Sequence, residues 1–128
     1  MTAKRATVLV VDDSPINLHL AVNILKNDYR VKVANNGAAA LELAAATSPD
    51  LILLDVMMPE MDGYEATALI RQDPRWKKLP IIAVTAKAMK DDQERCLAAG
   101  SNDYLAKPID LDRLFSLIRV WLPKMERI

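Results

Sequence analysis

Cysteine, histidine and glycine are scarce in this sequence of 128 residues, which has one cysteine, one histidine and three glycines. Because a disulfide needs two thiols, the lone Cys96 excludes a disulfide within the chain. Zinc is held mainly by cysteine and histidine, so a chain whose only histidine is His19 argues against a zinc site. None of the glycines forms a GxGxxG or GxxxxGKS/T run, which argues against the glycine-rich loops that bind nucleotide phosphates.

An excess of charge of one sign and a long apolar run are also missing. Seventeen basic residues balance seventeen acidic ones, which argues against a dedicated nucleic-acid surface. The apolar runs are far too short to span a membrane, and no signal peptide precedes Val8. We therefore expect a soluble cytoplasmic protein that does not contact the membrane. Its single globular domain is expected to have a core at about 7–122 and terminal extensions at 1–6 and 123–128, with Met1 as a natural N-terminus.

Short apolar segments alternate with helical patterns along the whole chain. Strands are predicted at 7–11, 30–34, 50–54, 81–84 and 102–106, and helices at about 15–26, 38–47, 63–72, 87–99 and 111–122. Uninterrupted alternation of this kind is typical of an α/β fold with a doubly wound parallel sheet and helices on both faces.

The apolar stripes of the helices differ in strength. The last helix has a nearly ideal stripe of Leu111, Leu114, Phe115, Ile118, Trp121 and Leu122. The helix at 87–99 has a thin one, made of Met89, Cys96 and Leu97, so we expect it to be held weakly. In the first helix, Leu20 belongs to a broad apolar face and His19 to the opposite, solvated arc.

Polar residues stand where four of the predicted strands end. They are Asp12 and Asp13, then Asp55, then Thr85, and finally Lys107. The carboxyl ends of parallel strands share one edge of a sheet, so these side chains should converge there. The alternative for Asp55 alone is a charge that merely ends a strand.

Three carboxylates at one edge repel each other, so cations must compensate them. Lys107 supplies one positive charge, and a divalent ion is the natural second. Ligands that are all oxygen suit Mg²⁺, for which Mn²⁺ can substitute. An aspartate, a lysine and a hydroxyl around such an ion are equipped for phosphoryl transfer, with Asp55 as nucleophile and Thr85 and Lys107 on the phosphoryl oxygens.

From Val8 to about Leu122 the chain closely resembles the CheY-like receiver domain of two-component response regulators. The resemblance rests on five markers in order: Asp12-Asp13, Leu54-Asp55-Val56-Met57-Met58-Pro59, Met61-Asp62-Gly63, Thr85-Ala86 and Lys107-Pro108. It implies the flavodoxin-like strand order 2-1-3-4-5. It also implies a signalling switch that catalyses its own phosphorylation and dephosphorylation and turns over no separate substrate.

The resemblance also implies roles for single residues. Asp55 matches the phosphoacceptor, which takes its phosphoryl group from a histidine kinase or phosphotransfer protein. Asp13 matches the direct Mg²⁺ ligand, Asp12 the acid that acts mainly through water, and Met57 the residue that offers its backbone carbonyl. Thr85, together with Lys107, matches the pair that grips the phosphoryl oxygens.

Signalling in this family depends on a further aromatic residue and on an output surface. Tyr104 matches an aromatic whose rotamer follows that of the threonine. With Lys87, Arg113, Leu117 and Val120 it is expected to form a face for an output domain or partner, or for a phosphorylation-dependent dimer. The alternative is that Leu117 and Val120 are ordinary exposed apolar residues.

Three other functions compete with a phosphorylation switch. A phosphatase of the haloacid dehalogenase type needs an acid two residues after its nucleophile, where this chain has Met57. A nucleotide-binding domain would need a glycine-rich loop, which this sequence lacks. A degenerate receiver that acts only as a docking module is disfavoured because all five site residues are present.

Overall fold

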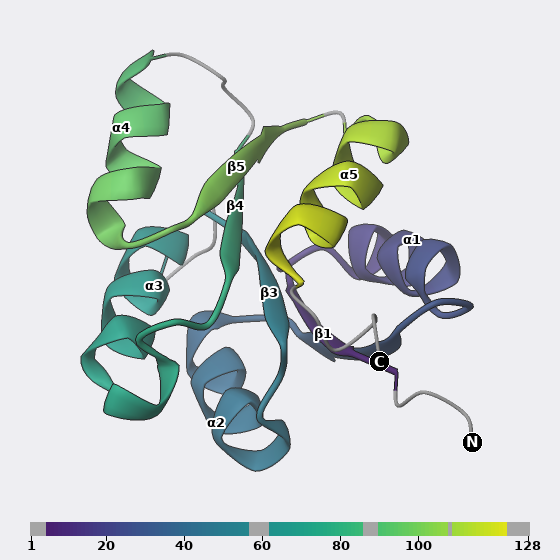
Figure 1. Ribbon diagram of the computed structural model, residues 1–128, viewed down its shortest axis with the longest axis horizontal. Coiled ribbons are helices and arrows are strands. Elements are labelled where there is room, and N and C mark those ends of the chain that lie inside the picture. The colour runs from purple at the N-terminus through teal and green to yellow at the C-terminus, as the bar shows by residue number, and fades with distance from the viewer. Residues whose placement is uncertain (1–4, 57–61, 86–89, 108, 123–128) are drawn as a thin grey trace.

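Figure 1 shows the computed structural model of the chain, which describes residues 5–56, 62–85, 90–107 and 109–122. Five parallel strands form one sheet in the order β2-β1-β3-β4-β5. They are β1 (Thr7–Val11), β2 (Arg30–Ala34), β3 (Leu51–Asp55), β4 (Ile81–Thr85) and β5 (Asp103–Ala106). The predicted fold class and strand order are confirmed.

Helices cover both faces of this sheet. They are α1 (Pro15–Leu25), α2 (Gly37–Thr47), α3 (Gly63–Gln72), α4 (Lys90–Ala99) and α5 (Leu111–Trp121), with a short 3-10 turn, η1 (Pro74–Trp76). In Figure 1, α1 and α5 lie on one side of the sheet and α2, α3 and α4 on the other. The edges of the sheet are β2, whose side chains are largely exposed, and β5.

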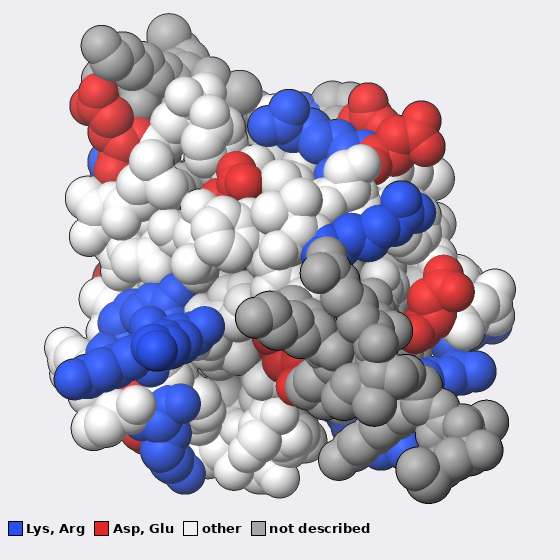
Figure 2. All heavy atoms as spheres, in the orientation of Figure 1, with Lys and Arg blue, Asp and Glu red and all other residues white. Residues whose placement is uncertain are grey.

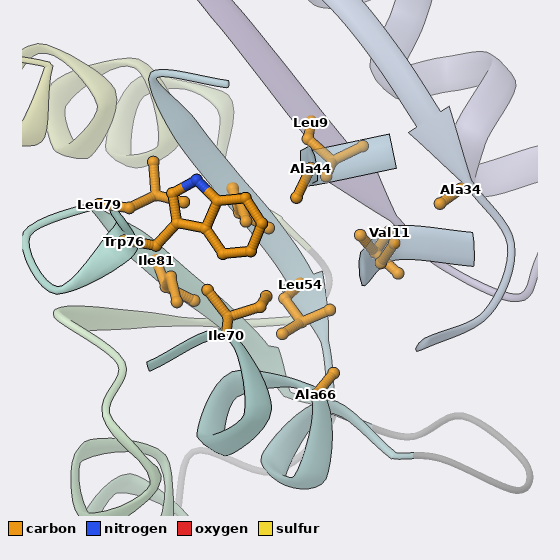
Figure 3. Close-up of a cluster of buried hydrophobic side chains, with 12 residues drawn as sticks. Leu9, Val11, Ala34, Ala44, Leu54, Ala66, Ile70, Trp76, Leu79 and Ile81 are labelled. Carbon is orange, nitrogen blue, oxygen red and sulfur yellow. The ribbon is translucent and has the colours of Figure 1, made fainter. Parts of the chain in front are cut away.

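Alternation along the strands divides the core between these two faces. Val10 and Leu53 pack with residues of α1 and α5, whereas Leu9 and Leu54 pack with residues of α2 and α3. Figure 3 shows the second of these clusters, in which the Trp76 ring lies beside Ile70, Leu79 and Ile81. Strands buried on both faces explain the continuous apolar runs in the sequence.

Polar side chains set the points at which helices begin. Ser14 accepts a hydrogen bond from the backbone N–H of Asn17, and Pro15 is the first helical residue of α1. Asn36, Asp62 and Asp110 cap α2, α3 and α5 in the same way. The caps fix where the helices start; α1 begins four residues after the end of β1, and α3 begins eight residues after the end of β3.

Arg71 joins the C-terminal ends of α3 and α4. Its guanidinium donates to the backbone carbonyl of Gly100 at 2.9 Å, to that of Trp76 at 2.7 Å and to Asn102 Oδ1 at 2.6 Å. Burial lowers the pKa of Arg71 from its usual value. These bonds anchor α4 at the end farther from the carboxyl edge of the sheet.

Several predicted bounds and exposures differ from the structure. β3 includes Asp55, and β5 begins one residue after Asn102, whose side chain instead accepts the N–H of Ile81 at 2.9 Å. Leu97 is 50% exposed and Leu111 is 46% exposed, although both were predicted on the apolar stripes of their helices. Leu20 is likewise exposed, although it was predicted on the apolar face of α1.

Other burial predictions are confirmed. Cys96 is fully buried and Trp76 packs under its loop, while His19 is exposed. The predicted start of the fourth helix, at 87–89, lies outside the described residues.

Charges of both signs are interspersed on the face shown in Figure 2, and neither sign covers it. Within the described ranges, no helix combines the length and the apolar character needed to cross a bilayer.

Candidate functional site

The register of the sheet brings the predicted site residues to one edge. Val11 pairs with Leu54, Asp55 with Val84, and Thr85 with Ala106. A row of paired positions runs across β1, β3, β4 and β5. Each site residue lies at most one position from a single such row; these residues are Asp12, Asp55, Thr85 and Lys107. The predicted convergence at the carboxyl edge is confirmed by this register.

Three carboxylates gather at this edge. Asp12, Asp13 and Asp55 each offer an oxygen, and these oxygens all lie within 4.8 Å of one another. Asp55 is 2% exposed and Asp12 is 7% exposed, whereas Asp13 faces solvent. Charges so close and so poorly hydrated raise the free energy of the site unless cations offset them.

Lys107 is the cation that the chain itself brings to the cluster. Its Nζ lies 3.2 Å from Asp55 Oδ2 and 3.8 Å from Asp12 Oδ2. Among the ion pairs of the described residues, this one ammonium faces three carboxylates, so negative groups outnumber it. The electrostatics therefore favours a further cation between the carboxylates.

The donor set fits Mg²⁺. Every ligand offered by the cluster is a carboxylate oxygen, the type that Mg²⁺ prefers. Two oxygens on one Mg²⁺ are at most about 4.2 Å apart, given metal–oxygen bonds of about 2.1 Å. The carboxylates thus need only a small closure to share one ion, directly or through its waters.

Asp12 is held by the first turn of α1, a contact that the sequence analysis missed. The backbone N–H of Ser14 donates to Asp12 Oδ1 at 2.9 Å, and Asn17 Nδ2 donates to Asp12 Oδ2 at 3.2 Å. The only signal in the sequence was the position of Asn17, three residues after the N-cap. Asn17 was not singled out because a polar residue there usually serves the helix itself.

Gly63 has a steric role that the sequence analysis also missed. Its N–H donates to the carbonyl of Val56 at 3.1 Å, which brings the start of α3 against the end of β3. A Cβ at this position would lie 2.5 Å from the carbonyl oxygen of Asp55 and 2.5 Å from Val56 Cα. Only glycine allows this approach, which holds the backbone of Asp55 in place.

The site straddles the edge between the two faces of the sheet. Asp55 and Lys107 line the same groove as Val10 and Leu53, on the side of α1 and α5. Thr85 follows the alternation of Ala83, which packs on the side of α4. Thr85 is nevertheless part of the same edge, because its carbonyl accepts the backbone N–H of Lys107 at 2.8 Å.

An apolar groove of about 380 Å³ leads from Asp55 between α1 and α5. Its floor is the sheet, and its walls include Leu20 and Ala21 of α1 and Leu114 of α5. Because Leu20 is exposed, the groove opens to solvent beside the carboxylates.

Tyr104 lies on the face of the sheet that α4 covers. It pairs with Ala83 in the neighbouring strand and packs, partly buried, against the cluster of Val56, Ala83 and Cys96, which includes a residue of α4. Arg95 of α4 stacks on the Tyr64 ring, 4.3 Å from its centroid, which ties α4 to the start of α3. The predicted switch pair, Thr85 and Tyr104, therefore occupies adjacent strands under α4.

The residues of the predicted output face are only partly brought together. Arg113 and Val120 are exposed on α5, but Leu117 is half-buried and packs against the cluster under α1 and α5. Leu117 therefore contributes less exposed surface than predicted. Lys87 lies outside the described residues, as do Met57, predicted to offer a carbonyl to the metal, and Pro108.

Comparisons with known proteins agree with this geometry. The family model described as "Response regulator receiver domain" matches residues 8–119. The chain is 45% identical over 118 residues to the signal transduction histidine-protein kinase BarA of Escherichia coli, covering 91% of the chain but 13% of that kinase. It is 38% identical over 117 residues to the polar-differentiation response regulator DivK of Brucella anthropi, covering 91% of the chain and 95% of DivK.

Among solved structures, the chain is similar to the receiver domain of the sensor histidine kinase PA1611 from Pseudomonas aeruginosa. The two share 38% identity with a TM-score of 0.86, and the match covers 94% of this chain and 100% of that domain. That structure is described as having a magnesium ion coordinated in its active site cleft.

Proposed function

Because this chain belongs to the family of response regulator receiver domains, we propose that it is a phosphoacceptor switch in which Asp55 takes a phosphoryl group from a phosphohistidine. One observation carries the proposal. The buried Asp55 lies within 4.8 Å of two further carboxylates and has a lysine ammonium 3.2 Å from its own oxygen. An isolated acid at the end of a strand would need neither.

The chemistry of the transfer follows from the side chains at the edge. A carboxylate oxygen of Asp55 attacks the phosphorus atom, the phosphorus–nitrogen bond breaks, and the electron pair stays on the imidazole of the donor. The product is an acyl phosphate on Asp55. When bound, Mg²⁺ supplies positive charge that offsets the repulsion between the carboxylates and the phosphoryl oxygens.

The remaining side chains stabilise the phosphoryl group. The Lys107 ammonium, already beside Asp55, neutralises charge on one phosphoryl oxygen. The hydroxyl of Thr85 donates to another oxygen. Asp12 and Asp13 would hold the metal, which can be Mg²⁺ or Mn²⁺. The family resemblance adds the backbone carbonyl of Met57, a residue outside the described ranges.

The signal leaves the site through α4. If Thr85 turns toward the phosphoryl group, it vacates space next to Tyr104 on the same face of the sheet. Tyr104 packs against the cluster that contains Cys96 of α4, so its movement would change the position of α4. An output domain, a partner or a second copy then reads the altered surface of α4, β5 and α5, with Tyr104, Arg113 and Val120 in contact.

The comparisons support a protein donor. The chain matches a short part of a signal transduction histidine-protein kinase. The expected donor is therefore a histidine kinase or a phosphotransfer protein. The groove between α1 and α5 supports this choice, because exposed apolar residues such as Leu20 beside a reactive group mark a contact surface. We further propose that the chain turns over no separate substrate.

The proposal is tested by incubating the chain with acetyl phosphate and MgCl₂ and measuring its intact mass. We expect a gain of one phosphoryl group, which is absent when EDTA replaces MgCl₂ and absent in Asp55→Asn. An equal gain in Asp55→Asn would refute the assignment of the acceptor.

A further inference from the structure

We propose that Asn17 is a positioning residue of this site, whose side-chain amide orients Asp12 toward the metal and leaves Lys107 to Asp55. The inference rests on the proposed function, since it concerns the same metal and the same acceptor.

The first turn of α1 is built around Asp12. Ser14 is the N-cap and Asn17 is the third helical residue. In a capping box, the side chain of that third residue bonds back to the N–H of the N-cap. Here Asp12 Oδ1 accepts the N–H of Ser14 at 2.9 Å instead, so the Asn17 amide is free to donate to Asp12 Oδ2 at 3.2 Å.

Asp12 Oδ2 also lies within reach of a cation. Lys107 Nζ is 3.8 Å from this atom but 3.2 Å from Asp55 Oδ2. Because Asn17 is neutral, it satisfies Asp12 Oδ2 without cancelling the charge of the carboxylate. The negative charge of Asp12 is therefore available to the metal, and the ammonium lies nearer to Asp55 than to Asp12.

Burial makes the orientation of Asp12 matter. At 7% exposure the carboxylate has little water around it, so its hydrogen bonds come from the protein. Asn17 itself is exposed, so replacing it removes the amide donor and leaves the core intact. A variant at this position is therefore expected to fold.

The test compares Asn17→Leu, which is nearly isosteric and has no donor, with Asn23→Leu on the exposed side of the same helix. Mg²⁺ is titrated into each chain, and the Kd is taken from the backbone amide shifts in NMR spectra. We expect a Kd about fivefold higher in Asn17→Leu, the effect of losing one hydrogen bond of about 1 kcal/mol. Asn23→Leu is expected to keep the Kd of the unchanged chain.

Asn17→Gln distinguishes loss of the amide donor from a change in side-chain shape. It keeps the donor but has a side chain one methylene longer. A Kd closer to that of the unchanged chain than to that of Asn17→Leu supports the proposal. Equal Kd values for Asn17→Leu and Asn23→Leu would overturn it, as would an Asn17→Gln Kd as high as that of Asn17→Leu.

Failure of this inference is distinguishable from failure of the proposed function. If acetyl phosphate labels Asp55 in all these variants while their Mg²⁺ affinities are equal, Asn17 has no positioning role and the acceptor assignment stands. If Asn17→Leu weakens Mg²⁺ binding but no chain is labelled, the positioning role stands and the proposed function fails.

Discussion

Lys107 and Thr85 are joined through their backbones, with the N–H of Lys107 donating to the carbonyl of Thr85 at 2.8 Å. The bond links the side of the sheet where Asp55 faces α1 and α5 to the side where Tyr104 meets α4. In the proposed switch, a charge placed on Asp55 would act on two residues whose backbones are hydrogen-bonded to each other. This bond is the route that we propose from the acceptor to the helix on the other face.

Replacing Lys107 with Met should destabilise the chain more in the absence of metal than in its presence. The substitution leaves Asp12 and Asp55 without their neighbouring ammonium. We expect the free energy of unfolding in EDTA to fall by about 1–2 kcal/mol, between the values for exposed and buried ion pairs. Mg²⁺ should restore most of the loss by binding the folded state. Urea unfolding in EDTA and in MgCl₂ measures the two free energies of unfolding. The control is Lys78→Met, at an exposed position. An equal loss of unfolding free energy in both buffers would contradict the account.

Asp13→Asn should lower the Mg²⁺ affinity of the chain and raise its stability in the absence of metal. Asp13 is the exposed member of three carboxylates within 4.8 Å. Removing its charge relieves repulsion, so the unfolding free energy in EDTA should rise by about 0.5–1 kcal/mol, while Mg²⁺ affinity falls about tenfold. Thermal unfolding in EDTA and a Mg²⁺ titration measure the two effects, with the exposed Asp28→Asn as control. A lower melting temperature in EDTA would show that the carboxylates do not repel each other.

Gly63→Ala should disturb Asp55 through the backbone. The added Cβ would lie 2.5 Å from the carbonyl oxygen of Asp55, so α3 or the end of β3 must shift. Overpacking of this kind should cost about 2 kcal/mol of unfolding free energy and slow phosphorylation. Urea unfolding measures the first effect, and Glu65→Ala in the same turn is the control. Unchanged stability would mean that the two backbones are not in close contact.

The thiol of Cys96 should report movement of α4. It is the only thiol in the chain, is fully buried, and packs beside Tyr104 and Tyr64. Phosphorylation should make opening of α4 easier and speed the reaction of Cys96 with a disulfide reagent about tenfold, which corresponds to about 1.4 kcal/mol. The rate in Asp55→Asn should not respond to acetyl phosphate. Equal rates before and after phosphorylation of the unchanged chain would rule out the route through Tyr104.

Arg75 should control the titration of Asp73. Hydrogen bonds from the side chain and backbone of Arg75 lower the pKa of Asp73 from its usual value. Since the folded pKa is the lower one, the contribution of Asp73 to stability is present above the unfolded pKa and is lost as pH falls through the folded value. NMR titration of the carboxyl carbon should show the pKa of Asp73 rising in Arg75→Gln. An unchanged value would mean that the ion pair does not persist in solution.

Much of the fold follows from the sequence because buried parallel strands leave unmistakable apolar runs, such as Leu51–Leu54. Exposure was harder to predict at the ends of helical stripes. Periodicity shows which face Leu97 and Leu111 share with their neighbours, but only the tertiary structure shows whether another element covers them.

The site divides in the same way. Asp12, Asp55 and Lys107 were predictable because each ends a strand, and strand ends share one edge in a doubly wound sheet. The contact of Asn17 and the steric role of Gly63 were missed because both depend on the path of the chain after the strand. The residue types alone do not show that the Asn17 amide donates to the Asp12 carboxylate. They also do not show that the backbones at Gly63 and Asp55 lie too close together to leave room for a Cβ atom.

The most direct test of the account is to locate the phosphoryl group in the unchanged chain. The chain is phosphorylated with acetyl phosphate and MgCl₂, digested at a pH that preserves acyl phosphates, and sequenced by tandem mass spectrometry. We predict a single modified residue, Asp55. Phosphoryl groups on Asp12, on Asp13 or on a hydroxyl in place of Asp55 would contradict the central claim that this edge of the sheet is organised around one acceptor.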